Sequence, residues 1–387
     1  MTVDEAERVR ALLHDVGFPE PRHDIGETVR IGRRRRATRW TTVVAAGAAA
    51  LVGAAVAVQG GPAAPPPRRD DEVARPATDC DLENLPLPDG VTSATVTGID
   101  PTGRFVVGSS DRDAGILWTD GQPRLLPAGS GGAAAVNASG VVVGTAGTGD
   151  ASPAWVYRDG RVERLPVPPD GGASAVSINA AGDIAGTIAG SAGTPAPIVW
   201  PAGEPRTYRL YTTPGPPVVR AITDTGVVVG GIEGRGPYRW NAYGDGQALP
   251  IMPAAAGGVA VDATGTWATG LLHWSLDRPD PRVNSYFPGG RTAVRWNLAT
   301  GEVTATGIDT MPVAVDPTGR VLLPQDPPRL VGPDNVQRPL PVDRRSHVTV
   351  AVGMSDNGVV VGYGSARDKD PATGLLASRP LRWVCVG

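Results

Sequence analysis

The chain has 387 residues and a net charge of −3, with 39 acidic residues against 36 basic ones. This balance excludes the strongly basic surface typical of nucleic-acid-binding proteins, so we expect no nucleic-acid partner. Glycine (52) and proline (39) are abundant, which favours many turns and short strands over long helices.

Residues 1–39 form the predicted cytoplasmic segment. Apolar residues recur at helical spacing between Val3 and Val16, with charged residues between them, so we expect a short amphipathic helix. This helix is either a plain surface helix at the terminus or a docking element, in which case residues 1–29 have a cytoplasmic partner.

Residues 40–58 are the predicted single transmembrane helix. No charge occurs from Thr41 to Val58, and 19 helical residues span about 28 Å, close to the bilayer core of about 30 Å. Arginines crowd the N-terminal flank from Arg30 to Arg39, which predicts that the N-terminus stays inside and the bulk of the chain lies outside the cell membrane.

Two alternatives to an anchor remain. The segment could be a buried helix, although the arginine flank and the proline-rich exit argue against this. It could also be a cleaved signal peptide, since Ala55-Val56-Ala57 resembles a cleavage site. The long, acidic leader is unlike an ordinary signal peptide, so we favour an uncleaved anchor. Residues 59–79 are a charged, proline-rich linker, expected to be extended and solvated.

Residues 80–387 contain seven copies of a strand–turn–strand motif. An Asn, Asp or similar polar residue precedes a turn that ends in glycine, a common hairpin closure. The seven turn glycines are Gly103, Gly140, Gly182, Gly226, Gly265, Gly319 and Gly358.

A third strand ending in Trp follows in six copies, and a fourth strand often ends in Leu-Pro. The mean spacing from Gly103 to Gly358 is about 42 residues, which is typical of a four-stranded propeller blade. The sequence therefore predicts an all-β, seven-bladed β-propeller, with the tryptophans packed between blades. The sixth copy lacks the Trp and is degenerate, which leaves the blade count open.

The ends of this region predict how the ring closes. The seventh copy stops before its fourth strand, whereas LENLPLP at 82–88 carries a spare strand with the Leu-Pro ending. We expect this segment to supply the outer strand of the last blade. Cys80 would then lie near Cys385, and a disulfide between them would contribute about 4–5 kcal/mol in the chain-entropy model, less any strain in the folded protein.

The motif resembles a known family. Asn or Asp followed by Gly, then Val-Val-Gly and a spaced Trp, resembles the HAF repeats of probable extracellular proteins over about residues 94–386, without the His-Ala-Phe triplet. This resemblance implies export and β-strand repeats, but no known activity and no functional residues. The basic run before the anchor is also similar to many actinobacterial membrane proteins.

No catalytic, nucleotide-binding or zinc motif is present, and the propeller region has only His273 and His347. We expect no cofactor and no bound metal. The acidic segments 111–115 and 368–374 could hold calcium, but neither supplies a complete oxygen-ligand loop, which favours solvated loops.

The longest inserted connection, 270–293, is the candidate binding loop, and its candidate contact residues are Trp274, Arg278, Arg282, Tyr286 and Phe287. Aromatic and Arg residues on loops of a rigid scaffold are typical of binding surfaces. The alternative is a long loop with incidental aromatics.

Three functions remain open. The first is a membrane-anchored binding or sensor module for an extracytoplasmic protein or glycan. The second is a propeller-type hydrolase or lyase with its site at the central channel. The third is signalling through a partner of residues 1–29. The absence of a catalytic motif favours a binding protein over an enzyme.

Overall fold

The computed structural model describes residues 80–147, 152–169, 171–189, 195–204, 206–274, 290–324, 327–369 and 376–385. The chain divides into two compact units, Met1–Glu72 and Val73–Gly387, and every described residue belongs to the second. The predicted cytoplasmic helix, membrane anchor and linker lie outside the described residues. Within the described ranges, no helix is long and apolar enough to cross a membrane.

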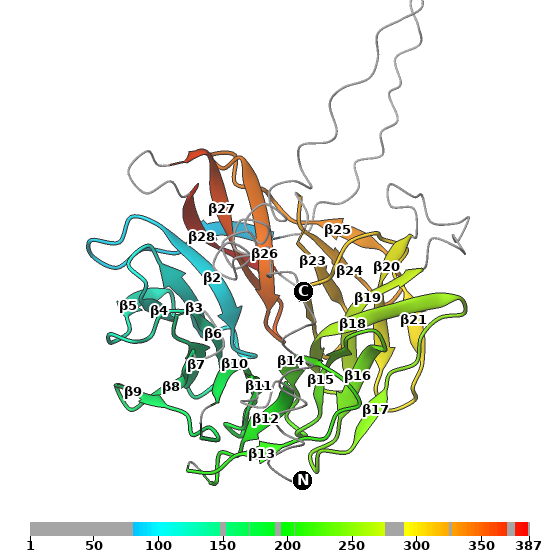
Figure 1. The fold of residues 1–387 in the computed structure, drawn as a ribbon. Helices are drawn as coiled ribbons and strands as arrows, with labels where there is room; N and C mark the ends of the chain where they lie inside the picture. The colour runs from blue at the N-terminus through cyan, green and yellow to red at the C-terminus, as the bar shows by residue number, and fades with distance from the viewer. Residues whose placement is uncertain are drawn as a thin grey trace, which may run out of the picture. The chain divides into compact units, whose positions relative to one another are not determined.

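The described residues of the second unit form seven four-stranded antiparallel sheets. Figure 1 shows these sheets arranged as successive blades around a centre. The structure therefore confirms the predicted seven-bladed β-propeller, and the degenerate sixth repeat builds a blade of its own.

The first three blades contain these strands, in order from the centre outward. Blade 1 is β2 (Ala94–Ile99), β3 (Phe105–Ser110), β4 (Gly115–Thr119) and β5 (Gln122–Leu125). Blade 2 is β6 (Ala133–Val136), β7 (Val142–Thr145), β8 (Ala154–Arg158) and β9 (Arg161–Arg164). Blade 3 is β10 (Gly172–Ile178), β11 (Ile184–Ala189), β12 (Ala196–Trp200) and β13 (Arg209–Leu210).

The next three blades follow the same order. Blade 4 is β14 (Pro217–Ile222), β15 (Val228–Ile232), β16 (Gly236–Trp240) and β17 (Gly246–Ala248). Blade 5 is β18 (Ala255–Thr264), β19 (Trp267–Trp274), β20 (Arg291–Asn297) and β21 (Val303–Ala305). Blade 6 is β22 (Ala314–Val315), β23 (Val321–Leu323), β24 (Arg329–Val331) and β25 (Gln337–Pro339).

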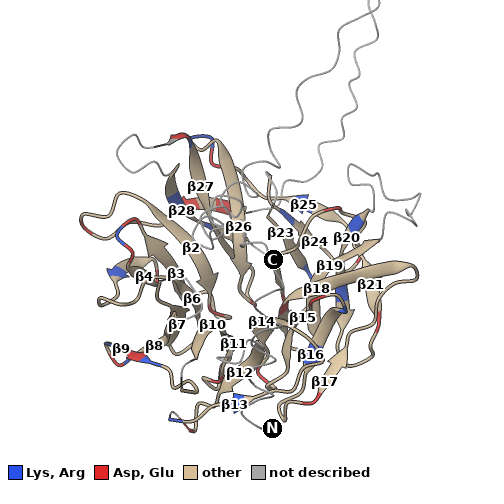
Figure 2. Ribbon diagram, viewed as in Figure 1, with Lys and Arg blue, Asp and Glu red and all other residues tan. Residues whose placement is uncertain are grey.

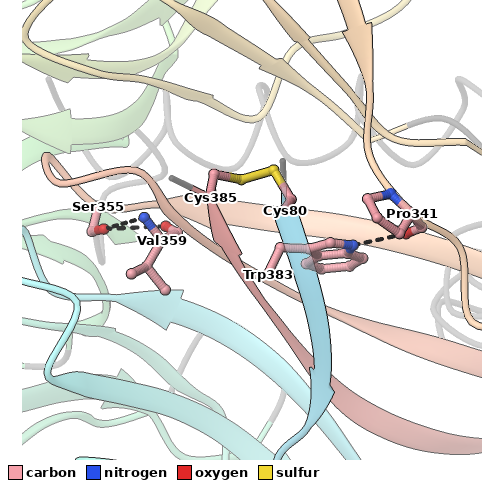
Figure 3. The surroundings of a disulfide bond; sticks show 6 residues. All are labelled: Cys80, Pro341, Ser355, Val359, Trp383 and Cys385. Carbon is pink, nitrogen blue, oxygen red and sulfur yellow. Dashed lines mark hydrogen bonds between the residues drawn. A yellow bond between two sulfur atoms is a disulfide. The ribbon is translucent and has the colours of Figure 1, made fainter. Parts of the chain in front are cut away.

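Blade 7 joins the two ends of the propeller. It consists of β26 (Val348–Met354), β27 (Val359–Lys369), β28 (Leu376–Cys385) and, as its outer strand, β1 (Cys80–Asn84). Cys80 pairs directly with Cys385 across the β1–β28 ladder, and their sulfurs form a disulfide. Figure 3 shows this bond at the seam of the ring. The predicted strand exchange and disulfide are confirmed, with the strand at 80–84 and the Leu-Pro pair just after it.

The Leu-Pro pair of one blade and the Trp of the next blade contact each other between the blades. The Leu is buried at the end of the outer strand, and the carbonyl oxygen of the Pro accepts a hydrogen bond from the Trp indole of the next blade. These bonds are 2.6–2.7 Å long and join Trp118 to Pro86, Trp200 to Pro166, Trp296 to Pro250, and Trp383 to Pro341. Figure 3 shows the last of them. The predicted inter-blade packing of the tryptophans is thereby confirmed and acquires a polar component.

Blade 2 departs from this pattern. Tyr157 pairs with Val142, the place that Trp118 takes opposite Val106 in blade 1. Trp155 lies two residues earlier, and its indole donates to the carbonyl of Gly131 at 3.1 Å. The prediction that Trp155 is equivalent to the other tryptophans is therefore wrong. Trp155 lies two residues before the equivalent position, which Tyr157 occupies.

A β-bulge interrupts the innermost strand of every blade except blade 6. Opposite the bulge lies the glycine of the Val-Val-Gly segment, or its counterpart. In blade 3, a Cβ on Gly186 would lie 1.8 Å from the carbonyl oxygen of Ser174. Blade 6 has no bulge and carries Leu323 at the same position. The recurrent glycine is thus required by the bulge.

Candidate functional site

A central channel runs between the innermost strands and contains a cavity of about 250 Å³. All seven blades contribute to its wall. In each blade a residue at, or equivalent to, the bulge position lines the cavity: Thr97, Ala134, Val176, Arg220, Val261, Val313 and Val352. A bulge turns one side chain out of the alternation of its strand, which explains why six of these residues face the channel; Val313 takes the equivalent place in blade 6 without a bulge.

The polar residue at the start of each turn stabilises that turn through hydrogen bonds, so it is not free to bind a ligand. In six blades this residue is at most 3% exposed: Asp100, Asn137, Asn179, Thr223, Asp316 and Ser355. The Oδ1 atom of Asp316, for example, accepts hydrogen bonds from the backbone N–H groups of Thr318 and Arg320 at 3.0 and 2.9 Å. The seven turn glycines all have positive φ, between 53° and 93°, as predicted for these turns.

The same turns are bonded from blade to blade around one mouth of the channel. The Nδ2 atom of Asn137 donates to the carbonyl of Asn179 at 3.1 Å, and Nδ2 of Asn179 donates to the carbonyl of Thr223 at 3.2 Å. Across the seam, the backbone N–H of Asp356 donates to the carbonyl of Pro101 at 2.9 Å. These bonds hold this mouth of the channel in a fixed shape.

Three carboxylates and one guanidinium line the cavity: Asp224, Asp262, Asp356 and Arg220. Asp224 and Asp356 lie in the turns and are exposed. The pKa of Asp356 is raised by partial burial and then by the negative charges of Asp224, Asp316 and Asp100. Apart from Asp316, which is ion-paired with Arg320, these carboxylates give the mouth of the channel an excess of negative charge.

Asp262 occupies a position where the other blades have a small residue. It lies two residues before the end of β18 and pairs with Thr269 just after the bulge. Ser177 holds the equivalent place in blade 3, where it pairs with Ala185. The Oδ2 atom of Asp262 accepts a hydrogen bond from the N–H of Val315 in blade 6 at 2.9 Å. Burial raises the pKa of Asp262 to about 6, against the effect of backbone hydrogen bonds and with a smaller contribution from Asp356.

Asp262→Asn is expected to stabilise the propeller above pH 6 by up to about 3 kcal/mol, because the folded protein must ionise a group whose pKa is raised from 3.8 to about 6. Between pH 4 and 6 the native state binds the proton more tightly than the unfolded state, so wild-type stability falls as pH rises through this window. The asparagine can still accept the hydrogen bond from Val315.

Denaturant unfolding of both proteins from pH 4 to pH 8 tests this prediction. The difference in the free energy of unfolding should shrink towards zero near pH 4. An Asp159→Asn variant, in an exposed outer turn, should match the wild type throughout. A difference between Asp262→Asn and the wild type that does not change with pH would contradict the electrostatic origin of the effect.

The described residues contain no group of three His, Cys, Asp or Glu side chains placed to hold a metal ion. Asp111, in the acidic segment 111–115, accepts hydrogen bonds from Thr92 and the backbone N–H of Ser93. The segment 368–374 falls largely outside the described residues. His273 lies on β19 and His347 before β26, and neither lines the cavity.

The candidate binding loop is shorter than predicted. Its ends belong to strands, because β19 continues to Trp274 and β20 begins at Arg291. Trp274 is a core residue with 5% of its surface exposed. The other four candidates, Arg278, Arg282, Tyr286 and Phe287, fall outside the described residues. The channel residues were not predicted, although in six of the seven blades they lie three residues before the turn residue, a regularity that is visible in the sequence.

Charged residues of both signs are spread over the loops and outer strands in the view of Figure 2.

No protein-family profile matches the chain, and no curated protein sequence matches it. Membership of the HAF-repeat family stays a prediction. Among solved structures, that of U3-55K is similar, with a TM-score of 0.46 and 11% sequence identity over 79% of this chain and 98% of that chain.

Proposed function

We propose that this protein is a membrane-anchored, extracytoplasmic binding module that presents the loops of its propeller to a protein or glycan. The observation that carries this proposal is the disulfide between Cys80 and Cys385, which closes the ring. Disulfides persist in oxidising compartments outside the cytosol, in agreement with export directed by residues 40–58. A rigid scaffold that holds variable loops is a common basis for binding.

The strand directions indicate which face would meet the partner. Strands alternate in direction within each blade, so the connections between second and third strands share one face. Cys385 ends β28, a third strand, and Cys80 begins β1 beside it. A third strand begins on the face that carries the second-to-third connections and ends on the other face. The chain therefore enters the propeller at Cys80 on the face away from those connections. In a tethered protein, the linker 59–79 would attach there and leave the connection between β19 and β20 on the distal face.

The sequence of that connection supports a binding role. Residues 275–289 include Arg278, Arg282, Tyr286 and Phe287, and Arg and aromatic residues are enriched among the residues that dominate binding energy. The connection starts and ends on a well-paired hairpin, in which His273 pairs with Arg291 and the N–H of Trp274 donates to the carbonyl of Gly290.

Affinity capture from native membranes tests this proposal with four proteins. The first is the full chain, and the second carries an Asn-Gly turn in place of 275–289, which preserves the hairpin. The third lacks residues 1–29, and the fourth carries the same Asn-Gly replacement at 370–375 in blade 7 as a matched control. We expect partners that are lost only from the second protein. Unchanged partners in that protein would overturn the proposed surface, and partners lost only from the third would indicate a sensor for a cytoplasmic circuit.

A further inference from the structure

The cavity of the central channel lies apart from the connection proposed above, and its shape comes from small side chains. At about 250 Å³ it is just below the size of pockets for drug-sized ligands, about 300–1,000 Å³. Its wall has Val, Ala or Thr at six of the seven bulge-type positions, and Arg220 at the seventh. No long side chain from the other six positions fills the channel, so a small molecule has room to enter.

The wall and the mouth of this cavity differ in chemistry. Val176, Val261, Val313 and Val352 present branched aliphatic groups around the wall. At the turns, Asp224 and Asp356 border the cavity and are exposed. Asp356 accepts no hydrogen bond among the described residues, whereas Oδ1 of Asp224 accepts one from the N–H of Ala180 at 2.8 Å. The site therefore combines the aliphatic groups of these valines, set in a lining that is polar over most of its surface, with an anionic rim.

The charges favour a cation at the mouth. Asp224, Asp262 and Asp356 outnumber Arg220, and the turn carboxylate of Asp100 adds to the negative potential there, whereas that of Asp316 is paired with Arg320. A divalent metal ion would need several converging oxygen ligands, and no such group is formed by the described residues. An organic ammonium ion is less demanding, because a single charge near two carboxylates suffices.

We propose that the central channel binds a small aliphatic amine, with the ammonium group at Asp224 and Asp356 and the hydrocarbon part against the valines of the wall. The ammonium donates hydrogen bonds to the carboxylate oxygens, and the hydrocarbon part leaves water for contact with the valine side chains. Because Arg220 also lines the cavity, a single positive charge suits the site better than two. The proposal does not depend on the outer loops or on membrane anchoring.

Titration calorimetry on the full-length chain tests the proposal with four probes: n-butylamine, n-butanol, butyrate and methylamine. The first three share a hydrocarbon part of similar size and differ in charge, whereas methylamine keeps the charge and lacks most of the hydrocarbon. We expect saturable binding of n-butylamine, weaker binding of n-butanol and methylamine, and no binding of butyrate. Absence of saturable n-butylamine binding, or binding of butyrate as tight as that of n-butylamine, would overturn the proposal.

A variant pair then assigns the ammonium position. Asp224→Asn with Asp356→Asn should weaken n-butylamine binding by about tenfold or more, the scale of one charge-assisted hydrogen bond. Asparagine can still accept the bond from Ala180, which preserves the turn. The affinity for n-butanol should stay the same, and so should n-butylamine binding by an Asp159→Asn control. Equal n-butylamine affinity in the wild type and the double variant would overturn the assignment to these carboxylates.

Discussion

Replacing Cys80 and Cys385 together with serine is expected to lower the free energy of unfolding by about 4–5 kcal/mol. The disulfide joins residues 305 apart, so its removal frees a very long loop in the unfolded chain. The β1–β28 ladder remains, but β1 is then held to the last blade only by its hydrogen bonds and by buried contacts such as Leu85. Denaturant unfolding of the wild type and the variant measures this difference.

Reduction of the wild type provides the matched control. A strong reductant should lower wild-type stability to that of the double serine variant and leave the variant itself unchanged. Equal stability of the oxidised and the reduced wild type would contradict the role of the disulfide in holding the ring closed.

The second large effect is expected at Gly186. In a Gly186→Ala variant the new Cβ would lie 1.8 Å from the carbonyl oxygen of Ser174 and 3.0 Å from the ring of Trp200. The backbone of β10 and the Trp200 ring would have to move together, at a cost of about 3–4 kcal/mol in the free energy of unfolding.

Blade 3 also offers the control for this substitution. Gly203 lies in an outer turn of the same blade, and a Cβ there would meet no atom within 4 Å. Gly203→Ala should therefore change stability by less than about 0.5 kcal/mol. Similar losses in the two variants would show that the Val-Val-Gly glycine is not constrained by the bulge.

The sequence predicted the architecture well because each repeated residue does a local task. The turn residue and its glycine close a hairpin, and the Leu-Pro and Trp elements join adjacent blades. The seam was predictable for the same reason: the chain has one spare outer strand, at 80–84, and one blade that lacks it. The turn and inter-blade features depend on neighbours within one or two repeats, and the seam joins the first and last segments of the repeat region, so comparison of the copies within a single chain can detect them.

The departures from the repeat were not predictable in this way. In blade 2 the strand register places Trp155 two residues before the position that Trp takes in most other blades. Tyr157 occupies that position instead. Asp262 matches the turn residue by its spacing to Gly265, yet the strand register places it two residues before the turn position, which Thr264 occupies, and there it bonds to blade 6. In blade 5 the inner strand continues to Thr264, and only the strand pairing shows this.

The channel illustrates a second limit. Arg220 and Val352 look like ordinary strand residues in sequence, but the bulges turn them towards the channel. A bulge changes the alternation of inward and outward side chains by one residue. The composition of the cavity therefore depends on strand registers that hydrophobic periodicity does not define.

Labelling of Lys369 in intact cells tests the proposed exported binding module most directly. Lys369 is the only lysine in the chain and lies at the end of β27 in the propeller, so an amine-reactive reagent that cannot cross membranes has one side-chain target. Peptide mapping should find Lys369 modified in intact cells and the N-terminal amine modified only after lysis, with no propeller label in a Lys369→Arg control. Modification of Lys369 only after lysis would contradict an extracytoplasmic propeller.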